Sequence, residues 1–190
     1  IEYKQNISDI SEIIQPTGIP SEVKTIGKNI PLIRIADIEN NSIKSKIGRR
    51  ISIENNSIDK FKKYFIKEGD ILLSHRGTIG KTVIVKKKDE GSIASNQILI
   101  LRCKKEIIPE YLFDYLNSKI FKKQIKSVSG GVMIPFLSIP QFRKCIISVP
   151  PIHIQKEKIA NTMKLESEIS DIERILLEKK NKLQEIRDNE

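Results

Sequence analysis

One long segment without glycine or proline constrains the fold of this chain more than any other feature. It follows Pro150-Pro151 and runs from Gln155 to Asp188. Two adjacent prolines stop a helix from continuing across them, and the segment beyond lacks the two residues that most disfavour a helix interior. The segment therefore predicts one helix of about 34 residues, which is about 50 Å long at about 1.5 Å per residue.

An apolar seam at heptad spacing follows this helix. Its members recur at intervals of 4, 3, 4, 7 and 3 residues, and Lys179 occupies the skipped position. They are Leu165, Ile169, Ile172, Leu176, Leu183 and Ile186. Such spacing is typical of a coiled coil. We expect dimerisation through the seam, with a helix of a second copy or of another subunit. The alternative is a helix packed back along its own domain.

The preceding residues predict a compact, β-rich domain with peripheral helices, so the fold class is α+β. Short apolar runs between turn residues predict strands over residues 30–38, 71–74, 82–85, 92–102 and 145–149. Asp9 and Glu12 predict the cap of a short first helix with Ile10, Ile13 and Ile14 on one face, and residues 39–50 predict an exposed loop. Pro109 predicts the start of a helix with Leu112, Leu116 and Ile120 on one face. We place the domain over residues 1–151 and the spacer helix over residues 152–190.

Positive charge is confined to the domain. Residues 152–190 hold eight of the 34 basic residues and nine of the 24 acidic ones, which leaves 26 basic and 15 acidic residues in 1–151. A lysine-rich base-composition bias would act on both segments, yet the helix carries −1 and the domain +11. A localised positive field indicates a polyanionic partner, most often nucleic acid. An ordinary basic domain is the alternative.

Catalytic and metal-binding motifs are missing from the sequence. Cys103 and Cys145 form no CxxC pair, and His75 and His153 show no metal-ligand spacing. We expect reduced thiols and a surface or loop position for His75. Residues 77–82 (GTIGKT) end like a phosphate-binding loop, but an earlier glycine is missing and a strand is expected to follow. With no methyl-donor, base-flipping or nuclease motif either, we expect no enzyme activity, no cofactor and no metal.

Membrane segments are also absent from the sequence pattern. No apolar run approaches the roughly 18 residues that a membrane-spanning helix needs. The first ten residues lack the basic and apolar regions of a signal peptide. We expect a cytoplasmic protein without a membrane partner.

Two stretches of the sequence together resemble the target-recognition domains of type I restriction–modification specificity subunits. The first is Gly69-Asp70-Ile71-Leu72-Leu73-Ser74, followed by Gly77-Thr78-Ile79-Gly80. The second comprises Gly130-Gly131, Leu137-Ser138 and residues 147–155 (ISVPPIHIQ), which lead into the long helix. Residues 30–38 resemble the family's IPWIRIGDI strand, with Leu32 in place of an aromatic residue and Ala36 in place of glycine. His153 and Ile154 stand where the family more often has an acidic pair.

This resemblance implies a non-catalytic subunit that recognises a specific double-stranded DNA sequence. Separate methylation and translocase–nuclease subunits would carry out the chemistry, and paired spacer helices would set the distance between two half-sites. A half-subunit that dimerises, a fragment of a two-domain subunit and the recognition domain of a fused methylase–nuclease all fit one such unit. From the residues alone, a coiled-coil scaffold with a protein partner is a further alternative.

The shared motifs supply turns, with Asp70 expected to accept a turn hydrogen bond, so the residues that read DNA are expected in the basic loops. Arginine suits guanine, lysine suits phosphate, and asparagine or glutamine suits adenine. The candidates are Arg49, Arg50, Lys60, Lys62, Lys63, Arg76, Lys81, Lys86, Lys87, Lys88, Asn96 and Gln97. The alternative for each is an ordinary solvated side chain, and for Asn96 and Gln97, expected on a strand, also a packed one.

Overall fold

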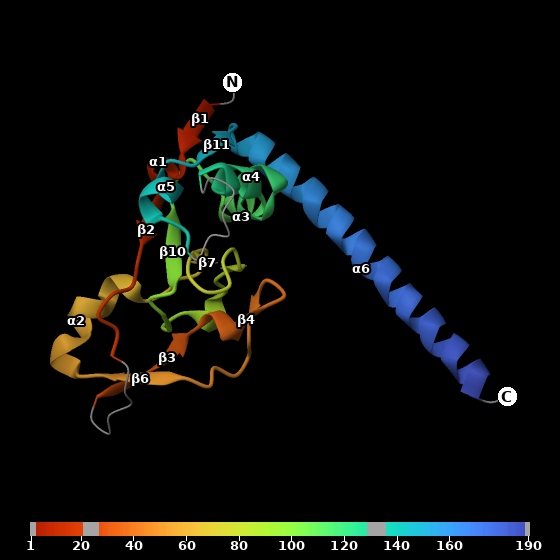
Figure 1. Cartoon of the computed structure of the whole chain (residues 1–190), viewed down its shortest axis with the longest axis horizontal. Helices are drawn as coiled ribbons and strands as arrows, with labels where there is room; N and C mark the ends of the chain where they lie inside the picture. Colours follow the sequence, from red (N-terminus) through yellow and green to blue (C-terminus); the bar gives the residue numbers. More distant parts are fainter. Residues whose placement is uncertain (1–2, 21–26, 129–135, 189–190) are drawn as a thin grey trace.

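The computed structural model describes residues 3–20, 27–128 and 136–188 (Figure 1). The strands in these residues are β1 (Tyr3–Asn6), β2 (Ser11–Ile14), β3 (Lys28–Ile33), β4 (Ile38–Glu39), β5 (Ser42–Ile43), β6 (Arg50–Ile53), β7 (Ile71–Ser74), β8 (Thr82–Ile84), β9 (Ile93–Ala94), β10 (Ile98–Cys103) and β11 (Ile146–Val149). The α-helices are α1 (Ile7–Ile10), α2 (Ile58–Phe61), α3 (Pro109–Asn117), α4 (Lys119–Val128), α5 (Ile139–Arg143) and α6 (Ile152–Asp188). Four single 3-10 turns are η1 (Ile35–Asp37), η2 (Asn55–Ser57), η3 (Lys62–Tyr64) and η4 (Lys87–Asp89). The expected α+β fold with a long C-terminal helix is confirmed. The Gly130-Gly131 motif lies outside the described residues.

A four-stranded antiparallel sheet of order β2-β10-β7-β8 forms the centre of the domain. Alternate residues of β7 face opposite sides, so Leu72 joins one buried cluster while Ile71 and Leu73 join the other. Because both faces of this sheet are buried, its two central strands, β7 and β10, read as continuous apolar runs rather than as alternating ones.

Each face of the central sheet has its own cover. The sheet of order β6-β3-β9, in which β3 pairs antiparallel with β6 and parallel with β9, encloses the first buried cluster. Helices α1, α3, α4 and α5, together with β11, enclose the second. Isoleucine and leucine dominate both clusters, and Phe121 and Phe142 meet edge to face in the second at 5.9 Å between ring centroids.

The N-terminal region differs from the expected helix. Only one helical turn forms, with Asn6 at its start, and the Asn6 backbone N–H donates to Asp9 Oδ2 at 3.2 Å. Ile13 and Ile14 lie instead on β2, which pairs with β10. They enter opposite buried clusters, which a single helical face cannot do.

Two expected strands are shorter than their apolar runs. β3 ends at Ile33, because the Arg34 backbone N–H donates to Asp37 Oδ2 at 2.8 Å and starts a 3-10 turn. The run over 92–102 is two strands in different sheets, joined by a turn at residues 95–97. An apolar run therefore marked burial correctly, but not the point where the chain turns.

The expected helix after Pro109 is also interrupted. α3 ends at Asn117, and Ser118 Oγ accepts a hydrogen bond from the Phe121 backbone N–H at 3.2 Å at the start of α4. Ile120 is consequently 65% exposed instead of sharing the buried face of Leu112.

α6 is one continuous helix that leaves the domain beside β11 and projects from it (Figure 1). Gln155 is fully buried, whereas every side chain from Met163 to Asp188 is exposed. The alternative of a helix packed back along its own domain is therefore wrong. No helix among residues 3–20, 27–128 and 136–188 is both long enough and apolar enough to cross a membrane.

Candidate nucleic-acid interface

A closed loop between β7 and β8 presents the first of the candidate residues. Ser74 holds its base, because Ser74 Oγ donates to the Thr78 carbonyl at 2.5 Å and accepts from the Lys81 backbone N–H at 2.8 Å. Gly77 adopts a φ of 68°, a conformation that favours glycine. The loop leads into strand β8, as expected, and not into the helix of a phosphate-binding loop. It leaves Arg76 exposed to solvent.

His75, at the base of this loop, connects it by hydrogen bonds to the β9–β10 turn and to Leu137. The residue lies in the loop directly after β7, which was one of the two expected positions, but it is 1% exposed and therefore not at the surface. Its backbone N–H donates to the Gln97 carbonyl at 3.0 Å, and its ring Nε2 bonds the Asn96 carbonyl at 3.1 Å. The Leu137 backbone N–H donates to the His75 carbonyl at 2.7 Å. Burial lowers the pKa of His75, which favours a neutral ring that donates from Nε2.

The β9–β10 turn places two amide side chains beside the same loop. Asn96 and Gln97 occupy this turn and are exposed, rather than lying on a strand. A side-chain carbon added at Gly77 would lie 4.0 Å from Gln97 Nε2 and 3.5 Å from Ile35 Cδ1. Gly77 thus marks the point where the loop, the turn and the segment after β3 meet.

A β-hairpin continues this surface at the start of the segment that was expected to be an exposed loop. Asn40 and Asn41 connect β4 to β5 with φ values of 48° and 54°. Two consecutive residues with positive φ form the tight turn whose twist suits a hairpin, and asparagine tolerates that conformation. Lys81 Nζ donates to the carbonyl of Ile38, the first residue of β4, at 3.1 Å. The hairpin therefore lies against the β7–β8 loop, and Lys44 and Lys46, which follow the hairpin in the sequence, are exposed.

The lysines after β8 lie next to the hairpin. Ser42 and Ile43 of β5 share a small depression with Lys86 and Lys88. Among the described residues, neither Lys86 nor Lys88 has an ion pair. Lys87 instead binds Glu90 at 2.6 Å, and this hydrogen bond raises the pKa of Lys87.

We call these residues together the recognition face. It comprises Arg34, Lys44, Lys46, Arg76, Lys81, Lys86, Lys88, Asn96 and Gln97. The two segments that supply its cations, residues 34–46 and 75–90, contain eight basic and four acidic residues. One of the acids, Asp37, is buried and binds Arg34 at 3.4 Å. The face thus joins an excess of positive charge to exposed amide groups.

Other candidates lie elsewhere. Figure 1 shows α2, which carries Lys60, on the opposite side of the domain from the β4–β5 hairpin. Lys62 binds Asp59 at 2.7 Å. Lys63 lies 5.0 Å above the ring of Tyr64.

The arginines at the start of β6 are also separate from the loops described above. Arg50 donates from Nε to Asn29 Oδ1 at 3.0 Å and from Nη2 to the Asn29 carbonyl at 2.9 Å. Its neighbour Arg49 has an exposed side chain, and the Arg49 carbonyl accepts from the Leu32 backbone N–H at 3.0 Å. Asn29 therefore holds the guanidinium of Arg50 against β3.

Three cations of the recognition face were missed by sequence reasoning, namely Arg34, Lys44 and Lys46. The available signal was Asn40-Asn41 between Ile38 and Ile43, a turn dipeptide flanked by β-branched residues. It would have predicted a hairpin with basic residues directly after it.

The recognition face suits binding to a duplex better than it suits a reaction. A two-stranded ribbon fits the DNA major groove, lysines meet phosphates, and arginine or amide side chains read base edges. No group of three or more histidine, cysteine or acidic residues that could hold a metal occurs in residues 3–20, 27–128 and 136–188. Burial raises the pKa of Cys103 to about 12 and also raises that of Cys145, so neither thiol is an activated nucleophile.

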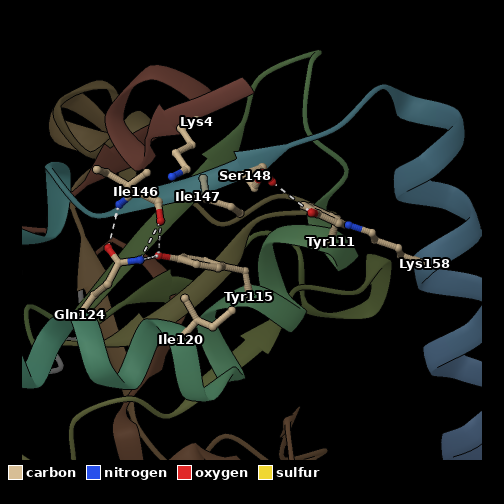
Figure 2. A pocket seen from close by; sticks show the side chains of 9 residues that line it. All are labelled: Lys4, Tyr111, Tyr115, Ile120, Gln124, Ile146, Ile147, Ser148 and Lys158. Atoms are coloured by element: carbon tan, nitrogen blue, oxygen red, sulfur yellow. Dashed lines mark hydrogen bonds between the residues drawn. The ribbon is translucent and has the colours of Figure 1, made fainter. Parts of the chain in front are cut away.

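A separate groove of about 620 Å³ lies where the domain meets α6 (Figure 2). Its lining residues are Lys4, Tyr111, Tyr115, Ile120, Gln124, Ile146, Ile147, Ser148 and Lys158. Gln124 mimics a neighbouring strand: its Nε2 donates to the Ile146 carbonyl at 2.8 Å, and its Oε1 accepts from the Ile146 backbone N–H at 2.9 Å. Tyr111 and Tyr115 donate to the carbonyls of Ser148 and Ile146. These groups cover the edge of β11.

Comparison with known proteins identifies a family and a curated relative that match most of this chain. The family described as the type I restriction modification DNA specificity domain matches residues 3–186. The type I restriction enzyme EcoBI specificity subunit of Escherichia coli is 27% identical over 158 residues, which cover 83% of this chain and 33% of that protein. The chain therefore spans about a third of this curated relative.

Two solved structures share the fold at low sequence identity. A chain from a structure on complex assembly and conformational transition of the type I R-M system matches with a TM-score of 0.71 and 16% identity, over 97% of this chain and 43% of that one. The HsdS subunit from Thermoanaerobacter tengcongensis matches with a TM-score of 0.63 and 15% identity, over 91% of this chain and 39% of the subunit.

Proposed function

The chain belongs to the family of type I restriction modification DNA specificity domains, and on that premise we propose that it recognises a specific double-stranded DNA sequence as a non-catalytic subunit. Residues 1–151 would bind the DNA and residues 152–190 would connect recognition units. Methyl transfer and cleavage would belong to a methylation subunit and a translocase–nuclease subunit that the chain directs to the site.

The observation that carries this proposal is the recognition face. Arg76, Asn96 and Gln97 project from loops tied together by buried His75, so their backbones are held in place before DNA arrives. Preorganised groups lose less conformational freedom on binding. Lys86 and Lys88 beside them supply the phosphate contacts that fix register on a duplex.

A second recognition unit is part of the proposal, because one unit spans only a third of the specificity subunit to which the chain is similar. The seam of α6 supports it. Leu165, Ile172 and Leu183 are 58%, 64% and 49% exposed, and an exposed stripe of this length rarely stays uncovered on a globular protein. We propose antiparallel pairing of α6 with an equivalent helix, from a second copy or from another recognition unit, with one domain at each end.

Duplex binding by the purified chain tests the proposal. If five or more phosphates are neutralised, the log–log dependence of the association constant on salt should have a slope of about −4 or steeper. A chain lacking residues 152–190 should keep this slope if it folds on its own. Affinity that is unchanged between low and moderate salt, together with DNA-independent binding to a protein, would favour the alternative of a coiled-coil scaffold.

Catalysis by the chain separates the proposal from an enzymatic role. Purified chain should transfer no labelled methyl group to DNA and should cut no strand. A mixture that also contains the methylation and nuclease subunits should carry out both reactions. Methyl incorporation by the chain alone would contradict the proposal. A longer parent chain that contains a methylase motif would instead identify the chain as the recognition domain of a fused methylase–nuclease.

A further inference from the structure

A single buried side chain attaches the long helix to the domain. Gln155 is 0% exposed, and its amide bonds three backbone groups. Oε1 accepts from the Ile108 N–H at 2.9 Å, while Nε2 donates to the carbonyls of Glu106 and Pro150 at 2.9 and 2.8 Å. Both N–H donors of the amide are used, so the side chain has one hydrogen-bonded orientation.

This attachment is distinct from the covalent link between the domain and α6. The chain enters α6 through Pro150-Pro151, and the Pro151 carbonyl accepts from the backbone N–H groups of Ile154 and Gln155 at 2.9 and 3.1 Å. A covalent link by itself is one point, about which a rigid rod can pivot. Gln155 adds a second point, on the segment before α3, and two points fix a direction.

Only the first turns of α6 touch the domain. Lys158 Nζ lies 5.8 Å from the centre of the Tyr111 ring, and Figure 2 shows this pair beside the groove. The Thr162 hydroxyl donates within α6, to the Lys158 carbonyl at 3.1 Å. The contact between Lys158 and Tyr111 joins side chains that are at least partly exposed, whereas the Gln155 amide is sealed from water. From Met163 to Asp188 the helix is free, a lever of about 39 Å at about 1.5 Å per residue.

We propose that Gln155 is a positioning residue that fixes the direction of α6, and through it the gap between the two half-sites that the paired protein accepts. The inference rests on the proposed function. A lever of about 39 Å that turns by about 10° moves its tip by roughly 7 Å, or about two base-pair steps of about 3.4 Å. The seam determines how two helices pair, whereas Gln155 determines where each domain then lies.

Two variants and one matched control test the inference. Gln155→Met keeps the length and helix propensity of the side chain but makes no hydrogen bond. Gln155→Glu keeps the shape and an acceptor but turns a carboxylate toward the carbonyls of Glu106 and Pro150. Gln184→Met makes the same change as the first variant at an exposed position of α6, where Gln184 bonds only Asp188 among the described residues, at 2.8 Å.

Two measurements are made on each full-length protein. The first is the distance distribution between spin labels at Lys105 on the domain and Lys180 on α6, in chains diluted with unlabelled protein. The second is affinity for duplexes whose half-sites are separated by gaps that increase by single base pairs, compared with a duplex that carries one half-site.

The parent and Gln184→Met should show a narrow distance distribution and bind the best gap at least about 100-fold more tightly than a single half-site. Both Gln155 variants should broaden the distribution and reduce the preference between neighbouring gaps to less than about threefold, with half-site affinity within about twofold of the parent. An unchanged gap preference with an unchanged distance distribution would overturn the inference. Loss of half-site affinity would overturn it as well, because it would make Gln155 a residue of the domain fold. If the parent binds no duplex, the proposed function fails, and the spin-label distances still decide whether Gln155 fixes the helix.

Discussion

Arg102 on β10 binds Asp70, which precedes β7, through two parallel hydrogen bonds, Nε to Oδ1 at 2.9 Å and Nη2 to Oδ2 at 2.8 Å. Asp70 Oδ2 also accepts from the Lys67 backbone N–H at 2.9 Å, which confirms the expected turn hydrogen bond. The Asp70 side chain is 2% exposed and that of Arg102 is 25% exposed. The pair therefore connects two central strands in a largely dry environment.

Burial, more than distance, should decide what this ion pair contributes to stability. We expect Asp70→Ala to lower the free energy of unfolding by about 3 kcal/mol, because it leaves the guanidinium without its carboxylate. Asp59→Ala breaks a pair that is just as short, 2.7 Å to Lys62, but both side chains are more than 70% exposed, so the expected loss is below about 1 kcal/mol. Urea unfolding of the two variants measures both values. Equal losses would contradict the explanation.

The buried ring of His75 predicts a pH dependence of stability. Because burial lowers its pKa in the folded state, the unfolded chain binds more protons as the pH falls. The stabilising contribution is complete above about pH 6.5, the unfolded value, and is lost as the pH falls from there through the folded pKa. His75→Gln should therefore show a shallower fall in melting temperature between about pH 7 and pH 5 than the parent. His153→Gln, at an exposed position, is the control and should follow the parent.

The position of the recognition face predicts which lysines bind DNA. Replacing Lys44, Lys86 and Lys88 by glutamine should lower duplex affinity and reduce the salt slope by about 2 to 3, since each lost phosphate contact removes about 0.9. The same replacement at Lys60, Lys62 and Lys63 removes equal charge from the opposite side of the domain and should leave the slope unchanged. Fluorescence anisotropy titrations across a salt series measure both slopes. An equal reduction of the slope in the two triple variants would contradict the prediction, because it would mean that only the total charge matters.

Pairing through α6 can be tested by moving two substitutions one residue along the helix. Leu176→Glu with Leu183→Glu places charges in the seam and should give a monomer that still binds DNA weakly. Leu177→Glu with Gln184→Glu makes two substitutions to the same residue just outside the seam and should leave the pair intact. Sedimentation equilibrium should give the parent a mass approaching twice the 21.8 kDa of one chain. A parent that stays monomeric at high concentration would assign the seam to a different protein.

Sequence patterns predicted those elements whose secondary structure is decided by their own residues rather than by tertiary contacts. The helix after Pro150-Pro151 needed only the absence of glycine and proline, and the buried strand β7 needed only its apolar run. The pattern failed where tertiary contacts decide. Ile13 and Ile14 fit a helix until opposite buried clusters separate them, and His75 is buried by hydrogen bonds to loops 20 or more residues away.

The candidate site was predictable to a similar extent. Arg76, Lys81, Lys86 and Asn96 stood out as residue types suited to DNA, but no local signal joins residues 34–46 to residues 75–97. That connection depends on the Lys81 bond to the Ile38 carbonyl and on β5 lying beside β8. The side chains that contact bases remain a prediction.

The most direct test of the central claim is the selection of bound duplexes from a random pool by the purified chain, with and without the methylation subunit. If the recognition face reads bases and two copies pair through α6, the enriched duplexes should contain two inverted, identical half-sites at a fixed gap. The seam variants Leu176→Glu and Leu183→Glu should enrich a single half-site. Enrichment of no sequence above the starting pool, with the methylation subunit present, would contradict the account.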